Sequence, residues 1–212
     1  YLDPIRVFTN NSTGKMGMAI ASAAVSLGAL VTVVYGKGTA AAPPGVTVVN
    51  VDTSDDMLGA VNSCLDSSNQ DVMIAAAAVG DWKPREKASG KITTHGSEGF
   101  AVELVPTAKI IDTVKKRHPE VFLVAFRALH DLSQDALIEN AYSRMNKAGA
   151  DLIAVNDVSK SGAGFGTDTN EVFVVDRAKN THHISLRPKA EVARQLMDIV
   201  TDSMRRTPST EE

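Results

Sequence analysis

The chain has 212 residues, of which 43% are apolar, and this is enough for one sizeable hydrophobic core. Its formal net charge is −3 at pH 7 with acids and bases interspersed, which disfavours a surface for nucleic acid or for an anionic membrane. The longest apolar runs, such as residues 72–79, are too short to cross a bilayer. The single cysteine, Cys64, cannot form an internal disulfide, which fits a reducing compartment. We therefore expect a cytoplasmic protein with no nucleic-acid or membrane partner.

Strand-like and helix-like segments alternate along the chain. Apolar β-branched runs are typical of buried parallel strands, and amphipathic segments that begin with Ser, Thr or Asp indicate helices. In chain order, the expected strands are residues 30–36, 46–51, 71–79, 121–126, 151–156, 171–176 and 182–186. The expected helices are an Ala-rich run at 18–29 and residues 53–67, 108–118, 134–149 and 189–204.

This alternation predicts an α/β fold of the doubly wound, Rossmann-like type, with a mostly parallel sheet, helices on both faces and a hairpin at one edge. We expect one domain over residues 1–204 and a flexible tail over residues 205–212. Only residues 5–8 precede the first helix, so either they form a very short strand or the natural first strand is lacking. We favour the second alternative. Ligands of such folds bind outside the carboxyl ends of the strands.

The segment TNNSTGKMG at residues 9–17 leads into the first predicted helix. Gly14 and Gly17 allow the backbone to approach a ligand, and the helix offers free N–H groups and the positive end of its dipole. The segment has neither the Walker A pattern nor the glycine fingerprint of dinucleotide-binding folds. It is a candidate anion site. The alternative is a helix cap with close helix–sheet packing, in which Lys15 points into solvent.

The segment AAAAVGDWKPREKASGKI at residues 75–92 follows a predicted central strand. Small side chains at the end of a strand leave room for a ligand, and Asp81 stands where ligand-binding residues gather in this fold. The charged stretch 84–91 contains Gly90, so we expect a mobile flap that carries Lys91 into the site. The alternative is an ordinary solvated loop.

A third loop, at residues 153–172, also follows a predicted strand. Its Asn156, Asp157 and glycines either bind a ligand or turn the chain toward the edge hairpin. Loops of this length are more often functional or interfacial than idle.

Five segments together resemble the phosphopantothenoylcysteine synthetase family. They are LDPIRVFTNNSTGKMG at 2–17, AAAAVGDWKP at 75–84, GKI at 90–92, DLIAVNDVS at 151–159 and GFGTDTNEV at 164–172. Each segment alone is a weak signal, but all five occur in the family's order and at similar spacing. The resemblance covers most of the chain.

The resemblance implies which residues form the site. Substrate contacts fall on Arg6, Asn10, Ser12, Thr13, Gly14, Ala77 and Ala78. Nucleotide contacts fall on Asp81, Lys91, Thr107, Ala108, Lys109, Ile110, Phe126, Arg144 and Lys147. Asn10 and Lys91 are the catalytic candidates, because amide and ammonium donors stabilise the negative charge that develops in acyl and nucleotidyl transfer.

The resemblance also implies the reaction, which joins 4′-phosphopantothenate to L-cysteine. The carboxylate attacks the α-phosphate of CTP or ATP, pyrophosphate leaves, and the cysteine amine then displaces the nucleoside monophosphate from the acyl-nucleotidylate. Mg²⁺ is expected to arrive with the nucleotide, held mainly by the triphosphate, and no protein ligand is assigned to it. A homodimer is expected, built from the edge hairpin and the Gly-rich loop at 161–166.

The sequence departs from the family at three places. Ala108 stands where the family usually has Pro, residues 127–131 read RALHD where many members have a Glu, and the family's strand and Gly-Gly-Thr segment before the Asp-Pro pair are absent. The segment 126–138 is similar to the archaeal and monofunctional versions. We expect either such a version or the C-terminal domain of a fusion with phosphopantothenoylcysteine decarboxylase.

The sequence lacks the features expected of two other function classes. An NAD(P)-dependent oxidoreductase would need an acid after the second strand and a Tyr-x-x-x-Lys pair, but residues 35–38 read YGKG and Asn146 stands four residues after Tyr142. A non-catalytic nucleotide-binding regulatory module is disfavoured because Asn10, Asp81 and Lys91 occupy the family's motif positions.

Overall fold

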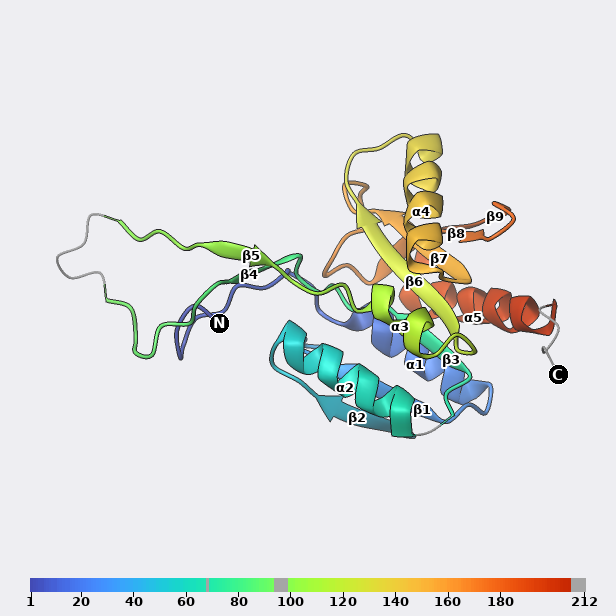
Figure 1. Cartoon of the computed structure of the whole chain (residues 1–212). Coiled ribbons are helices and arrows are strands. Elements are labelled where there is room, and N and C mark those ends of the chain that lie inside the picture. The colour runs from blue at the N-terminus through green and yellow to red at the C-terminus, as the bar shows by residue number, and fades with distance from the viewer. Residues whose placement is uncertain (68, 94–98, 207–212) are drawn as a thin grey trace.

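The computed structural model describes residues 1–67, 69–93 and 99–206, and Figure 1 shows a central sheet with helices on both faces. The strands are β1 (Val31–Tyr35), β2 (Val46–Asn50), β3 (Val72–Ala75), β4 (Trp82–Pro84), β5 (Leu104–Pro106), β6 (Phe122–Leu129), β7 (Leu152–Asp157), β8 (Thr169–Asp176) and β9 (Thr181–Pro188). The helices are α1 (Lys15–Ser26), α2 (Ser54–Ser67), α3 (Ile111–Arg117), α4 (Gln134–Ala148) and α5 (Lys189–Arg206).

The main sheet has five strands in the order β3-β6-β7-β8-β9. Strands β3, β6 and β7 are parallel, as expected for strands joined by helical crossovers. Strands β8 and β9 continue the sheet antiparallel and form the hairpin at its edge. The predicted α/β class, with its mostly parallel central sheet and edge hairpin, is confirmed.

Two hydrophobic clusters lie on opposite faces of this sheet. Successive strand side chains point to opposite faces, so Leu123 packs with α2, α3 and α4, whereas Val124 packs with α1 and α5. Both side chains are 0% exposed. At about 1.5–3 kcal/mol for each fully buried aliphatic side chain, these clusters are the main source of stability.

Local capping explains where two of the helices begin and end. Ser133 accepts a hydrogen bond from the Ala136 N–H at 3.3 Å at the start of α4, and Gly149 ends that helix with φ of 66°. At the start of α2, Thr53 and Asp56 exchange backbone-to-side-chain hydrogen bonds, both of 3.0 Å. These contacts agree with the predicted helix boundaries.

Strands β1 and β2 form a separate parallel pair that is not hydrogen-bonded to the main sheet. A cavity of about 2090 Å³ separates this pair from β3, and all residues of β1 and of β3 line it. Residues 5–8 are not a strand, so the described residues place none between β1 and β3. The alternative of a very short strand at residues 5–8 is therefore wrong. Asp3 bends this segment into a turn instead by accepting the N–H groups of Ile5 and Arg6.

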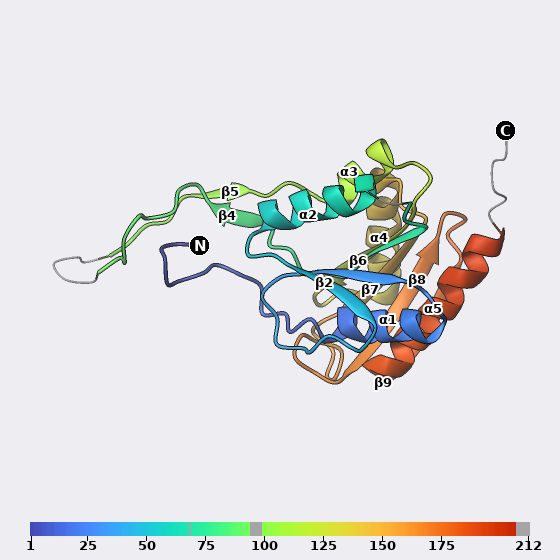
Figure 2. The ribbon, with the colours of Figure 1, turned by 90° about the horizontal axis from the view of Figure 1, so that it is seen from below.

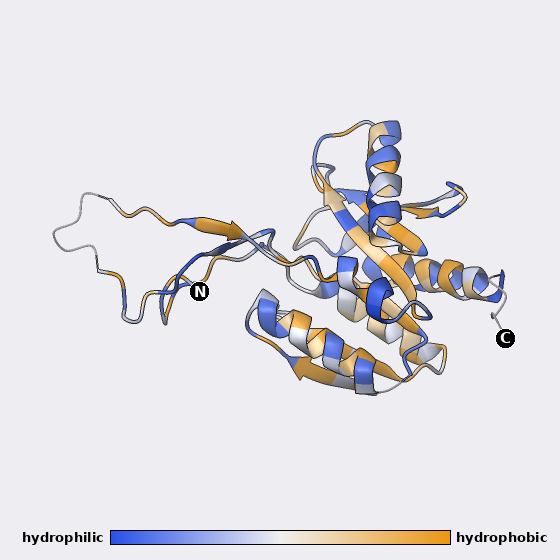
Figure 3. Ribbon diagram, in the orientation of Figure 1, coloured by the Kyte–Doolittle hydropathy of each residue, from blue (hydrophilic) through white to orange (hydrophobic). Residues whose placement is uncertain are grey.

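An arm projects from this body, and we define it as residues 1–9 together with β4, β5 and the described residues between these strands. Figures 1 and 2 show the arm from two directions, with the N-terminal segment running beside β4 and β5. Strands β4 and β5 pair antiparallel, with Trp82 opposite Pro106. Figure 3 shows that β5 is hydrophobic although it lies outside the sheet core. The sequence predicted a mobile flap over residues 84–91, but it did not predict the paired strands β4 and β5.

Helix α5 continues to Arg206, two residues beyond its predicted end. The remaining part of the predicted tail, residues 207–212, lies outside the described residues. Within the described part of the chain, none of the helices combines the length and the apolar character that a membrane span requires.

Candidate functional site

The segment 9–14 forms the entry to α1, as the sequence predicted. Gly14 has φ of 79°, and a Cβ at this position would lie 2.7 Å from the Tyr35 ring, so only glycine fits. Helix α1 has no side-chain cap and no acidic residue in its first turn. The Lys15 N–H donates to the Thr13 hydroxyl at 3.5 Å. No acidic side chain of the first turn opposes the positive end of the helix dipole, which therefore remains available to an anion.

Asn10 links this segment to the end of β3. Its side-chain amide donates to the Ala78 carbonyl at 3.1 Å, over 68 positions of sequence. Two predicted substrate-contacting residues are thereby brought together. Because the amide carries two N–H groups, one remains for a ligand.

Lys15, which one alternative placed in solvent, keeps 38% of its side chain exposed but also contacts the third loop. Its ammonium group donates to the Gly166 carbonyl at 3.1 Å and pairs with Asp168 at 2.6 Å. The ammonium holds the pKa of Asp168 below its ordinary value. Lys15 thus fastens the start of α1 to the third loop.

The third loop is itself held by internal hydrogen bonds. Asn156 donates to the Ala163 carbonyl at 2.9 Å, and Asp157 accepts the N–H groups of Asp131 and Ser159 and the Ser159 hydroxyl. The Ser159 hydroxyl is the first cause of a pKa of about 2 for Asp157. Of the two readings of this loop, these contacts favour the one in which it turns the chain toward the hairpin.

The nucleotide-binding candidates after β3 and β5 lie against each other. Thr107 donates its hydroxyl to the Gly80 carbonyl at 2.6 Å and its N–H to the Asp81 carbonyl at 3.0 Å. Lys109 pairs with the Asp81 carboxylate. The loop that begins with Asp81 and the segment that leads to α3 thus form one wall of the cavity.

Cationic side chains gather where β6 ends and α4 passes over it. Arg144 pairs with Asp112 of α3 at 2.6 Å. Arg127, the residue after Phe126, lines the same cavity with Arg144 and Lys147. Burial is the first cause, and the charge of Arg144 the second, of a lowered pKa for Arg127. The sequence analysis assigned no role to Arg127, although its place near the carboxyl end of a central strand was a signal.

A latch joins the N-terminal turn to the segment that carries Lys91. The Asp3 side chain is 0% exposed and accepts the Ile92 N–H at 3.1 Å, while Arg6 donates to Asp3 at 2.9 Å and to the Ile92 carbonyl at 2.6 Å. The Leu2 carbonyl also accepts the Ala88 N–H at 2.9 Å. The Arg6 guanidinium, followed by the backbone donors, holds the pKa of Asp3 far below its ordinary value against the opposing effect of burial.

Most of the predicted site residues line one cavity. These are Asn10, Ser12, Gly14, Ala77, Ala78, Asp81, Thr107, Ala108, Lys109, Ile110, Phe126, Arg144 and Lys147. Arg6, Thr13 and Lys91 do not line it. Arg6 is engaged in the latch, the Thr13 carbonyl accepts the N–H groups of residues 39 and 40, and Lys91 is exposed on the arm.

The chain matches, over residues 1–204, the family described as the C-terminal domain of DNA/pantothenate metabolism flavoproteins. It belongs to this family. The five sequence segments indicated the phosphopantothenoylcysteine synthetase family, and the match to the flavoprotein C-terminal domain family and to its relatives in coenzyme A biosynthesis confirms this recognition.

Two relatives of this flavoprotein C-terminal domain are bifunctional proteins. The coenzyme A biosynthesis bifunctional protein CoaBC of Thermococcus kodakarensis is 41% identical over 194 residues, covering 90% of this chain and 46% of that protein. The protein of the same name from Bacillus subtilis is 35% identical over 208 residues, covering 97% of this chain and 49% of that protein. The chain therefore spans about half the length of these relatives.

A solved structure of the C-terminal domain of the coenzyme A biosynthesis bifunctional protein CoaBC has the same fold. Its TM-score is 0.77 at 30% sequence identity, and the match covers 96% of this chain and 89% of that chain. The fold of this flavoprotein C-terminal domain thus agrees with the architecture described above.

Proposed function

We propose that this chain is a phosphopantothenate–cysteine ligase, which forms 4′-phosphopantothenoylcysteine from 4′-phosphopantothenate and L-cysteine at the expense of a nucleoside triphosphate. One observation carries the proposal: a glycine-rich helix start and a cationic wall line the same cavity. The relatives are named for coenzyme A biosynthesis, and this supports the choice of substrates.

In this proposal the start of α1 binds phosphopantothenate. The positive end of the α1 dipole attracts an anion, and Ser12, which lines the cavity, adds a hydroxyl donor. The second N–H of Asn10 donates to the acyl oxygen at which negative charge develops in the second step. The close contact of Gly14 with Tyr35 keeps this segment fixed, which favours pre-organised donors.

The opposite wall binds the nucleotide. Lys109, Arg144 and Lys147 line it, and their positive charge opposes the negative charge of a triphosphate while pyrophosphate departs. Lys91 lies on the arm, and we propose that the arm moves as a flap that brings this ammonium to the reacting phosphate.

Mg²⁺ is proposed to enter with CTP or ATP. Among the described residues, no cluster of three His, Cys, Asp or Glu side chains is arranged to hold a metal ion. The Asp81 carboxylate, whose side chain is 74% exposed at the cavity, is a suitable oxygen ligand, and Mg²⁺ commonly takes its other ligands from water and phosphate. Bound there, the ion would neutralise charge on the triphosphate.

The test is an assay that follows both products. Purified protein with phosphopantothenate, cysteine, Mg²⁺ and either CTP or ATP is expected to release pyrophosphate and to form the amide. Asn10→Ala is expected to lower the rate about 100- to 1000-fold, the effect of losing one pre-organised donor. Lys91→Gln should lower pyrophosphate release, and Lys116→Gln, on the exposed side of α3, is the matched control.

Two results would contradict these roles. Normal pyrophosphate release by Lys91→Gln would remove that lysine from the mechanism. Calorimetric binding of NADP with no binding of CTP or ATP would replace the ligase with an oxidoreductase, and nucleotide binding without turnover would indicate a regulatory module.

We also propose that the chain acts in the cytoplasm as a homodimer, alone or fused to a decarboxylase domain. The relatives are named as bifunctional proteins and are about twice as long as the segment that this chain matches, which supports a fusion. Two observations support a dimer interface on the hairpin surface. Among the described strands, β9 is the last of the main sheet, and the side chains of Leu186 and Phe165 are 51% and 43% exposed. Sedimentation of Leu186→Glu as a monomer would support this interface. A dimer that persists in Leu186→Glu but is lost in Phe100→Glu would move the interface to the arm.

A further inference from the structure

Two guanidinium groups face the cavity with buried N–H donors that lack a partner. Arg127 lies on β6 at the spacing of Leu123 and Ala125, so its side chain is on the face covered by α3 and α4. Arg144 reaches the same region from α4 with 16% of its side chain exposed. Within the described ranges, Arg127 Nε and Arg144 Nη1 are buried and make no hydrogen bond.

The charges around these groups do not balance. Arg144 is paired with Asp112, and Lys109 with Asp81. For Arg127 and Lys147 the described part of the chain provides no carboxylate partner within ion-pair distance. Burial and the neighbouring Arg144 both disfavour the charged form of Arg127, and Asp81 only partly opposes them.

Such an arrangement is unfavourable without a ligand and favourable with one. A buried donor without a partner loses its hydration, and two like charges in a poorly solvated place repel each other. An anion that accepts from both guanidinium groups removes both penalties, and a phosphate oxygen is a strong acceptor for such a fork of donors. The cavity is open and large enough to admit a polyphosphate.

We propose that Arg127 is a further phosphate-binding residue, which extends the cationic wall of Arg144 and Lys147 onto β6 and completes a polyphosphate subsite there. The ligand class is a di- or triphosphate chain with at least two adjacent charged groups. That the chain belongs to a nucleotide substrate rests on the function proposed above, whereas the subsite itself rests on the geometry of the three cations.

Calorimetry with inorganic tripolyphosphate tests the subsite directly. Arg127→Gln is expected to weaken tripolyphosphate binding about 10- to 100-fold, the effect of losing a charged hydrogen bond, and to make binding less sensitive to salt. Arg127→Lys should recover part of the affinity, because it restores the charge without the fork. The control is Arg205→Gln, whose side chain is 80% exposed near the end of α5. Affinity of Arg127→Gln within twofold of the unmodified protein would overturn the proposal.

Thermal unfolding separates binding from folding. Without ligand, Arg127→Gln should unfold at the same temperature as the unmodified protein or higher, because the substitution removes a partly buried charge that has no ion-pair partner among the described residues. With saturating tripolyphosphate the unmodified protein should gain more in melting temperature than the variant. If the ligand-free variant is less stable and both gain equally, Arg127 is a structural residue and the proposal fails.

The outcomes also separate this proposal from the ligase. Arg127-dependent binding of tripolyphosphate in a protein that forms no amide would sustain the subsite and refute the ligase. Amide formation at the normal rate and normal nucleotide KM by Arg127→Gln would sustain the ligase and refute the subsite.

Discussion

The sheet core and the arm are built on opposite principles. In the core, Leu123, Ile153 and Leu196 are 0% exposed and packed on all sides. On the arm, Ile5, Trp82 and Phe100 are 65%, 52% and 62% exposed, and the contacts that hold the arm are largely polar. Burial in the body therefore supplies most of the stability, whereas the arm leaves large apolar side chains exposed.

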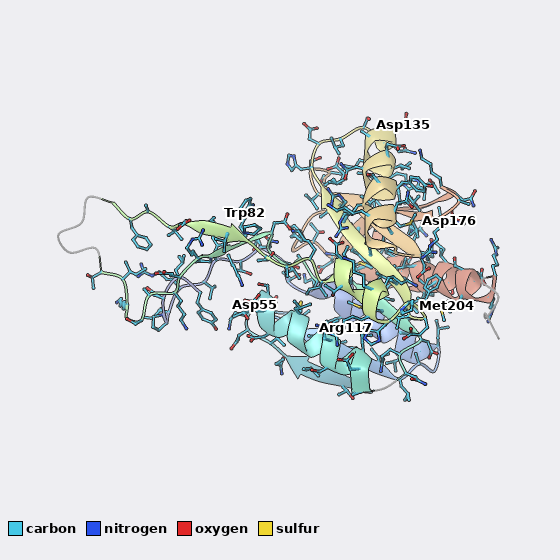
Figure 4. The ribbon with its side chains drawn as sticks, in the orientation of Figure 1. Asp55, Trp82, Arg117, Asp135, Asp176 and Met204 are labelled. Carbon is cyan, nitrogen blue, oxygen red and sulfur yellow. The ribbon has the colours of Figure 1, made fainter. Side chains whose placement is uncertain are left out.

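Polar contacts also fasten the base of the arm to the rest of the molecule. Lys83 of β4 pairs with Asp55, and Figure 4 shows Asp55 near the arm end of α2 and Trp82 on the arm itself. Tyr1 lies under the ammonium groups of Lys37 and Lys87. An exposed ion pair such as Lys83–Asp55 contributes about 0–1 kcal/mol to the free energy of unfolding. The hydrogen bonds of the buried Asp3 side chain are therefore the contacts that we expect to hold the two strands of the arm to the N-terminal turn.

The largest expected effect is in the core. Leu123→Ala removes a fully buried side chain between β6 and the helices, and we expect a loss of about 2–5 kcal/mol in the free energy of unfolding. Urea denaturation measures this value. A loss below that of the arm variant described last would contradict the division between body and arm.

The next largest effect should come from breaking the latch. Asp3→Asn weakens the hold on Ile92, and the resulting misplacement of Lys91 is expected to lower turnover in the assay of the proposed ligase up to about 100-fold. Trp82 is the only tryptophan of the sequence and lies on the arm, so its fluorescence anisotropy reports the mobility of the arm and should fall in this variant. The free energy of unfolding of the body, measured by urea denaturation, should change little. Unchanged anisotropy together with unchanged turnover would show that the latch does not position the flap.

A smaller, pH-dependent effect is expected for Asp157. Its pKa of about 2 in the folded protein lies below the value of about 3.9 for an unfolded aspartate, so ionisation stabilises the fold above pH 4. This contribution is lost as the pH falls toward 2. The difference in unfolding free energy between the unmodified protein and Asp157→Asn should therefore be constant from pH 7 to 5 and shrink from pH 4 to 3. A difference independent of pH would contradict this account.

The smallest effect is expected on the arm surface. Phe100→Ala alters a side chain that is 62% exposed, so the free energy of unfolding should change by less than about 0.5 kcal/mol. Urea denaturation at low protein concentration measures it, and the Leu123→Ala variant is the reference. A larger loss would mean that the arm contributes to the core.

Local signals were enough to predict the body. β-branched runs marked β6 and β7, and the residues that cap α4, Ser133 and Gly149, stand at the boundaries read from the sequence. The arm was missed because its strands are three residues each, bounded by prolines, and pair across a long separation without alternation in sequence. A pairing of that kind has no local pattern.

The site shows the same limit. The motif residues Asn10 and Asp81 were recognised from their segments, but the partner of Lys15 is Asp168, 153 positions away. Arg127 was passed over because charge alone does not reveal burial. The Arg127 Nε is buried without a hydrogen bond because α3 and α4 pack over this part of β6. That packing joins segments that are separate in the sequence, so no local pattern predicts it.

The latch has a consequence for the order of folding events. Asp3 and Ile92 are 89 positions apart, so their contact closes a long loop, and contacts of this kind form after local ones. We expect the latch to be absent from the folding transition state, so that losing it leaves the folding rate unchanged and speeds local opening. In hydrogen exchange, the Ile92 amide should then open independently of the β6 amides, as a separate cooperative unit.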